Sequence, residues 1–187
     1  MSPEPVTTAP PSPAGTTLRA PFRLGPMPMD RHMITVDEQV VRAPRERIFR
    51  LAADVERWPD HLPHYRFVRF REKARDGGGL VEMSANRPFG PANWPTWWLS
   101  RMTVDATIPN IRFLHVGGIT TDMDVEWQFV RRPTDDETLV RIVHVWNGPG
   151  WPLIGRVAAQ AVIGPVFVHG IASRTLAGLA SAAERGA

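Results

Sequence analysis

Between residues 65 and 147 the chain carries six strand-like segments in succession, with no helix-length segment among them. Each segment alternates apolar and polar residues or is rich in β-branched and aromatic residues, as strands are. Turn signals at 76–79, 109–110, 117–118 and 134–136 separate most of them. Parallel neighbours would need a long crossover, usually a helix, so this succession predicts an antiparallel meander. The segments are YRFVRFREKA, GGLVEMSANR, WWLSRMTVDA, NIRFLHVGG, MDVEWQFVRR and TLVRIVHVWN.

The residues before the meander predict one more strand and two helices. The strand ITVDEQVVRA begins at Ile34. Pro44 after it suits the first turn of a helix, because its missing N–H needs no partner there. Apolar residues then recur at helical spacing over residues 48–55. This helix is expected to stop or kink before Pro59, which together with Pro63 marks a short second helix and a turn.

The end of the chain, from residue 152 to about residue 185, has a helical composition, with a kink or break expected at Gly164-Pro165. One long helix can cover the concave face of a curved antiparallel sheet, and a cavity remains where side chains do not fill the space. We therefore expect an α+β fold, with a curved antiparallel sheet of about seven strands around a long C-terminal helix and two short helices after the first strand. The domain should span residues 34–187, after a Pro-rich tail at residues 1–33 that is disordered or extended.

The segment RPFGPANWPTWW, residues 87–98, is expected to form a loop between two strands. It is too rich in bulky apolar groups for a plain solvent loop. Its tryptophans, Trp94 among them, either form a lid over a ligand or belong to the core.

The charge pattern argues against nucleic acid as a partner. The net charge is +3, and acidic residues are interspersed among the basic ones. A nucleic-acid-binding domain concentrates its basic residues on one face. The densest basic stretch alternates along a predicted strand and is interpreted as a solvated face; it comprises Arg66, Arg69, Arg71, Lys73 and Arg75.

The chain contains no cysteine, which excludes disulfides, thiolate catalysis and Cys-based metal sites and fits a reducing compartment. No signal peptide is visible near the N-terminus. The longest charge-free stretch, residues 157–173, is shorter and more polar than the roughly 20 apolar residues of a membrane span. We expect a cytoplasmic protein with no stable membrane span.

Six short motifs in the predicted domain carry a family resemblance. They are V-x-A-P-x-E-x-I-F at 41–49, A-D-V-E-R-W-P at 53–59, H-V-G-G at 115–118, M-D-V-E-W at 123–127, V-H-V-W at 143–146 and I-A-S-R-T-L at 171–176. These motifs resemble the START-like (SRPBCC) superfamily, and within it the polyketide cyclase/dehydrase and coenzyme Q-binding-protein branch. The resemblance covers about residues 34–185 and implies a helix-grip fold with a hydrophobic ligand between the sheet and the C-terminal helix. It is not specific for activity, because the same framework serves lipid carriers, cyclases and chaperone-like binders.

Strand alternation indicates which side chains line the expected cavity, since residues two apart share one face of a sheet. Within MDVEWQFV the apolar residues share a face opposite the acidic ones, and LVRIVHVW places a histidine among apolar residues of one face. We expect the ligand to contact Trp97, Phe113, Met123, Val125, Trp127, Phe129, Ile142 and Trp146.

Three polar residues are candidates for catalysis. His144 and His115 are expected to point into the cavity, and Arg101 shares a face with Trp97. Histidine titrates near neutral pH and can act as general acid or base, while an arginine can hold an enolate or carboxylate oxygen. The alternative is that both histidines are hydrogen-bonded wall residues and that the Arg101 stem covers apolar surface. No metal and no cofactor are expected, because HxH and HExxH spacings are absent.

Three functions fit these observations. The first is a protein that holds a polyketide, aromatic or isoprenoid intermediate, beside a partner biosynthetic enzyme, and promotes its cyclisation or dehydration. The second is a non-catalytic lipid or quinone carrier. The third is a regulatory interaction module, which would need a basic surface patch that this chain shows only weakly. The identity of the ligand and the oligomeric state stay open at this point.

Overall fold

The computed structural model describes residues 19–89, 92–134, 136–148 and 168–186, without the side chains of residues 87–94. Its elements are β1 (Met33–Val41), α1 (Arg45–Ala53), a 3₁₀ turn (Val55–Arg57), α2 (Trp58–His61), β2 (Tyr65–Lys73), β3 (Gly79–Phe89), β4 (Ala92–Asp105), β5 (Asn110–Gly118), β6 (Asp124–Arg131), β7 (Thr138–Trp146) and α4 (His169–Glu184).

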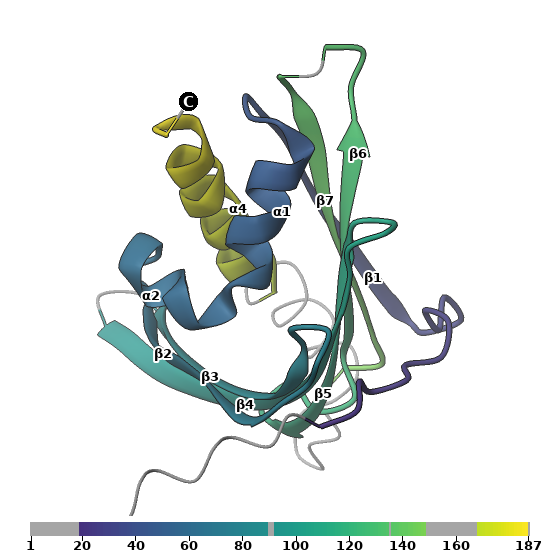
Figure 1. Ribbon diagram of the computed structural model, residues 1–187. Helices are drawn as coiled ribbons and strands as arrows, with labels where there is room; N and C mark the ends of the chain where they lie inside the picture. Colours follow the sequence, from purple (N-terminus) through teal and green to yellow (C-terminus); the bar gives the residue numbers. More distant parts are fainter. Residues whose placement is uncertain (1–18, 90–91, 135, 149–167, 187) are drawn as a thin grey trace, which may run out of the picture.

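The seven strands form one sheet in the order β1-β7-β6-β5-β4-β3-β2, and every neighbouring pair is antiparallel. β2 to β7 are a meander, whereas β1 lies at the far edge beside β7. Figure 1 shows that the sheet curls strongly and that α1, α2 and α4 all lie on its concave side. The predicted α+β fold and the order of its elements are confirmed.

The helical segment after β1 breaks earlier than the sequence predicts. α1 ends at Ala53, because Asp54 leaves the helical region with φ −83° and ψ 64°. Pro59 does not stop a helix but lies in the first turn of α2, where a proline is tolerated. The break at Asp54 redirects the chain, and Trp58 at the start of α2 is buried.

The described part of the C-terminal helix is α4, which buries one face. The buried positions recur three and four residues apart, as expected for an amphipathic helix; they are Ala172, Thr175, Leu176, Leu179, Ala180 and Ala183. The predicted start at residue 152 and the kink at Gly164-Pro165 lie outside the described residues. Within the described part of the chain, no helix is long and apolar enough to cross a membrane.

The Trp- and Pro-rich segment at 87–98 is part of a hairpin and not a loop, which corrects the prediction. β3 continues to Phe89, β4 begins at Ala92, and these two residues pair, as do Arg87 and Trp94. Backbone pairing with the partner strand satisfies N–H and C=O groups whatever the composition of the segment. The side chain of Trp94, for which a lid or a core position was expected, lies outside the described residues.

Part of the predicted tail lies against the sheet. Residues 19–32 contain no helix, and Arg19 forms an isolated parallel bridge with Ala74 just after β2. The Arg101 guanidinium lies 5.5 Å from the centre of the Phe22 ring. The described tail therefore contacts the side chains that point away from the helices, while residues 1–18 lie outside the described residues.

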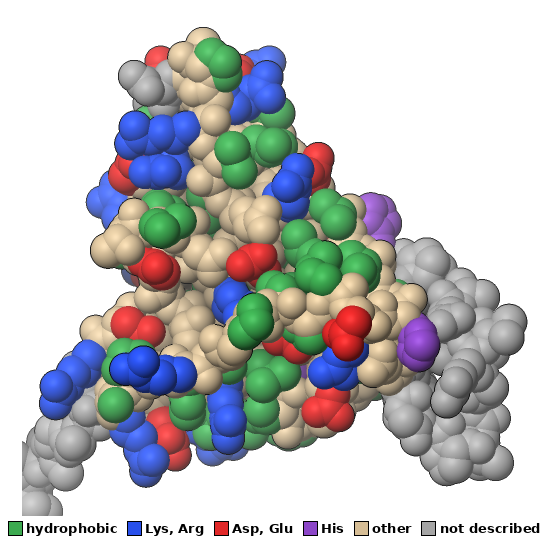
Figure 2. Space-filling model, turned by 90° about the vertical axis from the view of Figure 1, so that its right-hand side faces the viewer, with side chains coloured by type: hydrophobic (Ala, Val, Ile, Leu, Met, Phe, Trp, Pro, Cys, Tyr) green, Lys and Arg blue, Asp and Glu red, His purple; other side chains and the backbone are tan. Residues whose placement is uncertain are grey.

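The edge strand β1 has an unexpected orientation. Its apolar residues Ile34, Val36 and Val40 are exposed, and Figure 2 shows hydrophobic side chains interspersed with charged ones on this side of the molecule. Its alternate residues, including Thr35 and the buried Asp37, point toward the helices. The inner face of β1 therefore combines polar residues in the middle of the strand with the apolar Met33 and Val41 at its ends.

A buried carboxylate on the convex face ties three strands together. Glu82 on β3 accepts hydrogen bonds of 2.7 Å from Arg69 on β2 and from the indole N–H of Trp97 on β4, and Arg71 pairs with it at 2.7 Å. These side chains cover the Glu82 side chain and leave 7% of it exposed. The bonds, that from Arg69 foremost, hold the pKa of Glu82 at about 2.

The substitution Glu82→Gln should weaken the fold in a pH-dependent way. Because the folded-state pKa lies below the ordinary value of 4.5, the ionised carboxylate stabilises the protein above that pH. This contribution is lost as the pH falls toward the folded-state value. We expect Glu82→Gln to lower the free energy of unfolding by about 1–2 kcal/mol at neutral pH, with the difference from wild type shrinking in acid.

Urea denaturation from neutral to acidic pH measures both effects. Glu38→Gln is the matched control, because its ion pair with Arg141 is largely solvated and such pairs contribute little. An equal loss of stability in the two variants would contradict the role assigned to Glu82.

Two glycines of α4 should respond in opposite directions to alanine. A Cβ at Gly178 would lie 2.3 Å from Cδ2 of Leu62, which is fully buried, whereas at Gly170 it would meet open space. Alanine favours a helix over glycine by about 1 kcal/mol, so Gly170→Ala should stabilise slightly. Gly178→Ala should destabilise by about 1–3 kcal/mol, since Leu62 cannot move without disturbing the core. Urea denaturation of the pair tests this, and a stability gain in Gly178→Ala would argue against the close approach of α4 to Leu62.

Candidate functional site

A pocket of about 60 Å³ lies between the concave face of the sheet and α4. On this measure one water needs roughly 10–15 Å³, so the pocket holds a few waters and a multi-ring ligand must widen it. The lining residues come from α2, β2 to β7, the β5–β6 turn and the start of α4. They are Trp58, Tyr65, Met83, Trp98, Phe113, His115, Thr120, Met123, Val125, Trp127, Ile142, His144, Val168, Ile171, Ala172 and Thr175.

Aromatic rings form the middle of the pocket. The Trp58 ring lies 5.3 Å from Tyr65, 5.7 Å from Trp127 and 6.4 Å from Phe113, measured between ring centroids. Such separations are typical of favourable ring contacts. Trp58 reaches this position because the short 3₁₀ turn brings α2 over the sheet. The rings offer an apolar surface suited to a flat, hydrophobic molecule.

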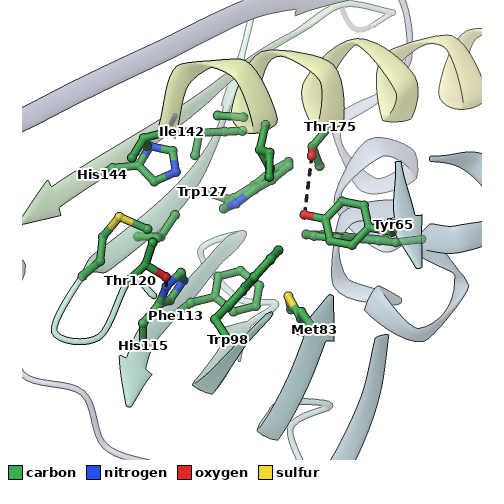
Figure 3. A pocket seen from close by; sticks show the side chains of 16 residues that line it. Tyr65, Met83, Trp98, Phe113, His115, Thr120, Trp127, Ile142, His144 and Thr175 are labelled. Carbon is green, nitrogen blue, oxygen red and sulfur yellow. Dashed lines mark hydrogen bonds between the residues drawn. The ribbon is translucent and has the colours of Figure 1, made fainter. Parts of the chain in front are cut away.

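Two histidines mark one end of the pocket (Figure 3). The Nδ1 atom of His115 lies 2.6 Å from the hydroxyl of Thr120, and its ring stacks on Trp98 at 6.1 Å with an interplanar angle of 18°. The Nδ1 atom of His144 lies 3.4 Å from the hydroxyl of Thr35. Each hydrogen bond engages one ring nitrogen and so orients the imidazole.

A second polar group lies at the opposite end (Figure 3). The Thr175 hydroxyl of α4 is 3.5 Å from the Tyr65 hydroxyl and 3.1 Å from Nε2 of His64. Burial lowers the pKa of His64, and the positive charge of Arg174 lowers it further. At neutral pH this end of the pocket therefore carries hydroxyls and an uncharged imidazole.

Seven of the residues predicted from strand alternation line the pocket: Phe113, His115, Met123, Val125, Trp127, Ile142 and His144. Two others are buried elsewhere. Phe129 packs edge-on against Phe49 at 5.3 Å, and the indole N–H of Trp146 donates to the carbonyl of Thr121 at 2.9 Å. The latter two residues belong to the core beside the pocket.

Trp97 and Arg101 do not face inward, so this part of the prediction is wrong. Trp97 is 41% exposed and Arg101 is exposed, whereas Trp98 and Ser100 are buried on the concave side. The adjacent tryptophans made the phase of the alternation ambiguous. On the convex face Glu82 accepts the Trp97 indole N–H.

Sequence reasoning missed the lining residues that come from other elements. Trp58, Tyr65 and Met83 line the pocket from α2, β2 and β3, whereas the predicted lining came from the later strands. A signal was available in the C-terminal segment, where the lining positions recur at helical spacing; they are Val168, Ile171, Ala172 and Thr175. No comparable pattern marks Thr120, which lies in a turn.

The described lining contains no Arg, Lys, Asp or Glu. Over the same described residues, no three His, Asp or Glu side chains gather as metal ligands. The polar chemistry of this pocket therefore rests on imidazole and hydroxyl groups.

A curved antiparallel sheet that holds a C-terminal helix over an apolar pocket defines the helix-grip, or START-like, class of domains. The model of the family described as polyketide cyclase / dehydrase and lipid transport matches residues 41–165, more than half of the chain. The chain belongs to this family. No curated protein matches the chain significantly.

Solved structures share the fold at low sequence identity. The Zhui aromatase/cyclase from Streptomyces aligns with a TM-score of 0.68 at 17% identity, covering 82% of this chain and 94% of its own. A Thermus thermophilus protein aligns with a TM-score of 0.68 at 17% identity, covering 83% of this chain and 99% of its own. A START superfamily protein from Mycobacterium smegmatis aligns with a TM-score of 0.64 at 15% identity, covering 82% of this chain and 99% of its own. These similarities establish the fold.

The hydrogen bond between His115 and Thr120 offers a direct test of the site geometry. Thr120→Val keeps the volume of the side chain but removes its hydroxyl. We expect the free energy of unfolding to fall by about 1 kcal/mol. The ring ¹⁵N resonance of His115 Nδ1 should shift, because this atom loses its partner. An unchanged His115 spectrum would contradict the contact.

Proposed function

We propose that the pocket binds a hydrophobic small molecule of the polyketide, aromatic or isoprenoid type. The observation that carries this proposal is the cage of rings from Trp58, Trp98, Phe113 and Trp127 beneath α4. Aromatic side chains bury large apolar areas and stack well on flat ligands. Membership of a family described by polyketide and lipid ligands supports the same conclusion.

The histidine end of the pocket suits cyclisation and dehydration of a poly-β-keto chain. One imidazole removes a proton from a CH₂ between two carbonyls, and the resulting enolate carbon bonds to another carbonyl carbon of the same chain. The other imidazole, protonated, gives its proton to that carbonyl oxygen. Loss of this hydroxyl with a neighbouring hydrogen, as water, forms a C=C bond. These steps are redox-neutral and need only proton transfers to one of the two imidazoles, His115 and His144, and from the other.

Arg101 has no part in this proposal, because it lies on the convex face beside Phe22. A poly-β-keto substrate is reactive and must be supplied by an enzyme that builds such chains. We therefore propose that the protein acts beside a partner biosynthetic enzyme, in the cytoplasm.

A non-catalytic carrier of a lipid or quinone is the second candidate. The hydroxyls of Thr120 and Thr35 lie beside the two histidines, as expected for hydrogen-bonded wall residues. The family description also includes lipid transport. In this alternative the rings supply affinity and the histidines have no chemical role.

Replacing the histidines separates the two candidates. We expect His115→Phe and His144→Phe to slow cyclisation of a synthetic poly-β-keto thioester by about 10²-fold or more, the size of effect typical of a lost general acid or base. Binding of 2-naphthol, followed by quenching of tryptophan fluorescence, should change only a few-fold. His32→Phe, at an exposed histidine, is the control.

Unchanged cyclisation in both variants would contradict catalysis and favour the carrier. Failure of wild-type protein to bind 2-naphthol at all would contradict the proposed pocket.

A further inference from the structure

A groove of about 520 Å³ lies where α1, α2 and α4 meet. Figure 1 shows these three helices beside one another on the concave side of the sheet. The groove shares no described lining residue with the apolar pocket. Its volume falls within the range of roughly 300–1,000 Å³ that is typical of small-molecule sites. The lining residues are Arg47, Arg50, Leu51, Asp54, Arg57, His61 and Ala182.

Helix α1 turns two arginines toward this groove. Arg47 and Arg50 are three residues apart, so they are neighbours on the surface of the helix. Leu51 continues the same face at helical spacing. The opposite face is apolar and packs into the core; it holds Ile48, Phe49 and Ala52. The amphipathic pattern of α1 therefore fixes which of its residues line the groove.

Arg47 and Arg50 contact main-chain carbonyls and, among the described residues, no carboxylate at ion-pair distance. Arg47 donates to the carbonyl of Gly186, which follows α4, and Nε of Arg50 donates to the carbonyl of Glu46 at 3.2 Å. A guanidinium carries five N–H donors in a fixed fork. Each arginine therefore keeps donors for a further acceptor.

The third arginine of the groove is already compensated. Arg57 pairs with Asp60 at 2.5 Å. The hydrogen bond and charge of Asp60, and to a smaller extent the charge of Asp54, raise the pKa of the Arg57 guanidinium. Asp54 is the only carboxylate in the described lining of the groove. An anion is therefore favoured beside Arg47 and Arg50 and disfavoured beside Asp54.

We propose that this groove binds a phosphorylated small molecule, with the phosphate held by Arg47 and Arg50 and the organic part against Leu51 and Ala182. The planar fork of an arginine bonds two phosphate oxygens at once, which makes arginine a preferred phosphate ligand. The inference goes beyond the proposed function and is independent of it, because the groove and the apolar pocket have no described lining residue in common.

The shape and lining of the groove favour a phosphate ester over a free phosphate ion. A single phosphate group fills only part of the groove volume. Leu51 and Ala182 offer apolar surface to the remainder of a ligand. A concave site of this size also suits a small molecule better than the flat surface of a membrane.

The test titrates the full-length protein with phenyl phosphate and with inorganic phosphate, by calorimetry at low ionic strength. We expect wild type to bind phenyl phosphate about threefold or more tightly than inorganic phosphate, because the ring buries apolar surface. Arg50→Gln should weaken the binding of phenyl phosphate by about tenfold, the effect of one lost charge-assisted hydrogen bond. Asp54→Asn should tighten it a few-fold, since a repelling carboxylate is removed.

Two controls separate this groove from general attraction and from the apolar pocket. Arg141→Gln removes the same charge on β7, beside Glu38, and should change the affinity for phenyl phosphate by less than about twofold. Saturating 2-naphthol, the probe of the apolar pocket, should not displace phenyl phosphate. The opposite effects expected for Arg50→Gln and Asp54→Asn also distinguish loss of the site from loss of the fold.

Several results would overturn the inference. The first is that wild type binds neither phosphate probe, or binds both equally. The second is that Arg50→Gln and Arg141→Gln weaken binding to the same extent, which indicates attraction by net charge alone. The third is that 2-naphthol displaces phenyl phosphate, which places the probe in the apolar pocket. The last is Arg50-dependent sedimentation with phosphatidylserine vesicles without binding of phenyl phosphate, which assigns the groove to a membrane surface.

Discussion

The contacts of helix α4 at its start and in its C-terminal half keep it above the concave sheet, and the pocket lies beneath the residues between them. Toward its C-terminal half, Gly178 lets Leu62 approach the helix closely. At its start, His169 pairs with the buried Asp37 of β1. Burial raises the pKa of the Asp37 carboxyl, and the neighbouring His169 opposes that rise. Between these contacts the helix turns the small side chain of Ala172 toward the sheet, and the space is left unfilled.

The concave face of the sheet lines the pocket, whereas the convex face carries contacts that join the strands. The neighbouring tryptophans of β4 illustrate this difference. Trp98 turns inward and forms a wall between the polar ends of the pocket. Trp97 turns outward and donates to Glu82, whose carboxylate also holds two arginines of β2. These contacts of Glu82 on the convex face thus join β2, β3 and β4. The same three strands carry Tyr65, Met83 and Trp98 of the pocket.

Binding and catalysis make different demands on this site. The rings by themselves satisfy what a hydrophobic carrier needs, since apolar contact supplies affinity without fixed chemistry. A cyclase must in addition hold a flexible chain in one shape, which takes polar contacts at defined positions. Polar groups at both ends of the pocket, around His115 and around Tyr65, meet that second demand. The pocket is therefore better suited to orienting a ligand than a purely apolar cavity would be.

The sequence by itself determined the meander, the flanking helices and most of the inward residues of β5, β6 and β7. These are consequences of local periodicity and turn residues, which act over a few positions. The motifs of the chain also identified the family that the family model confirms. The hairpin at 87–98 was predicted as a loop because its strand pairing is not visible in its proline-rich composition, and the end of α1 at Ala53 carries no proline to mark it.

Only the tertiary structure decided which tryptophan of β4 faces the pocket, since alternation has two phases and Trp97 contacts Glu82 on the convex face. It also brought together Tyr65 and Thr175, which are 110 residues apart. No local pattern links such distant positions. Their contact arises because the curled sheet and α4 meet there, and the second polar end of the pocket exists only in the folded chain.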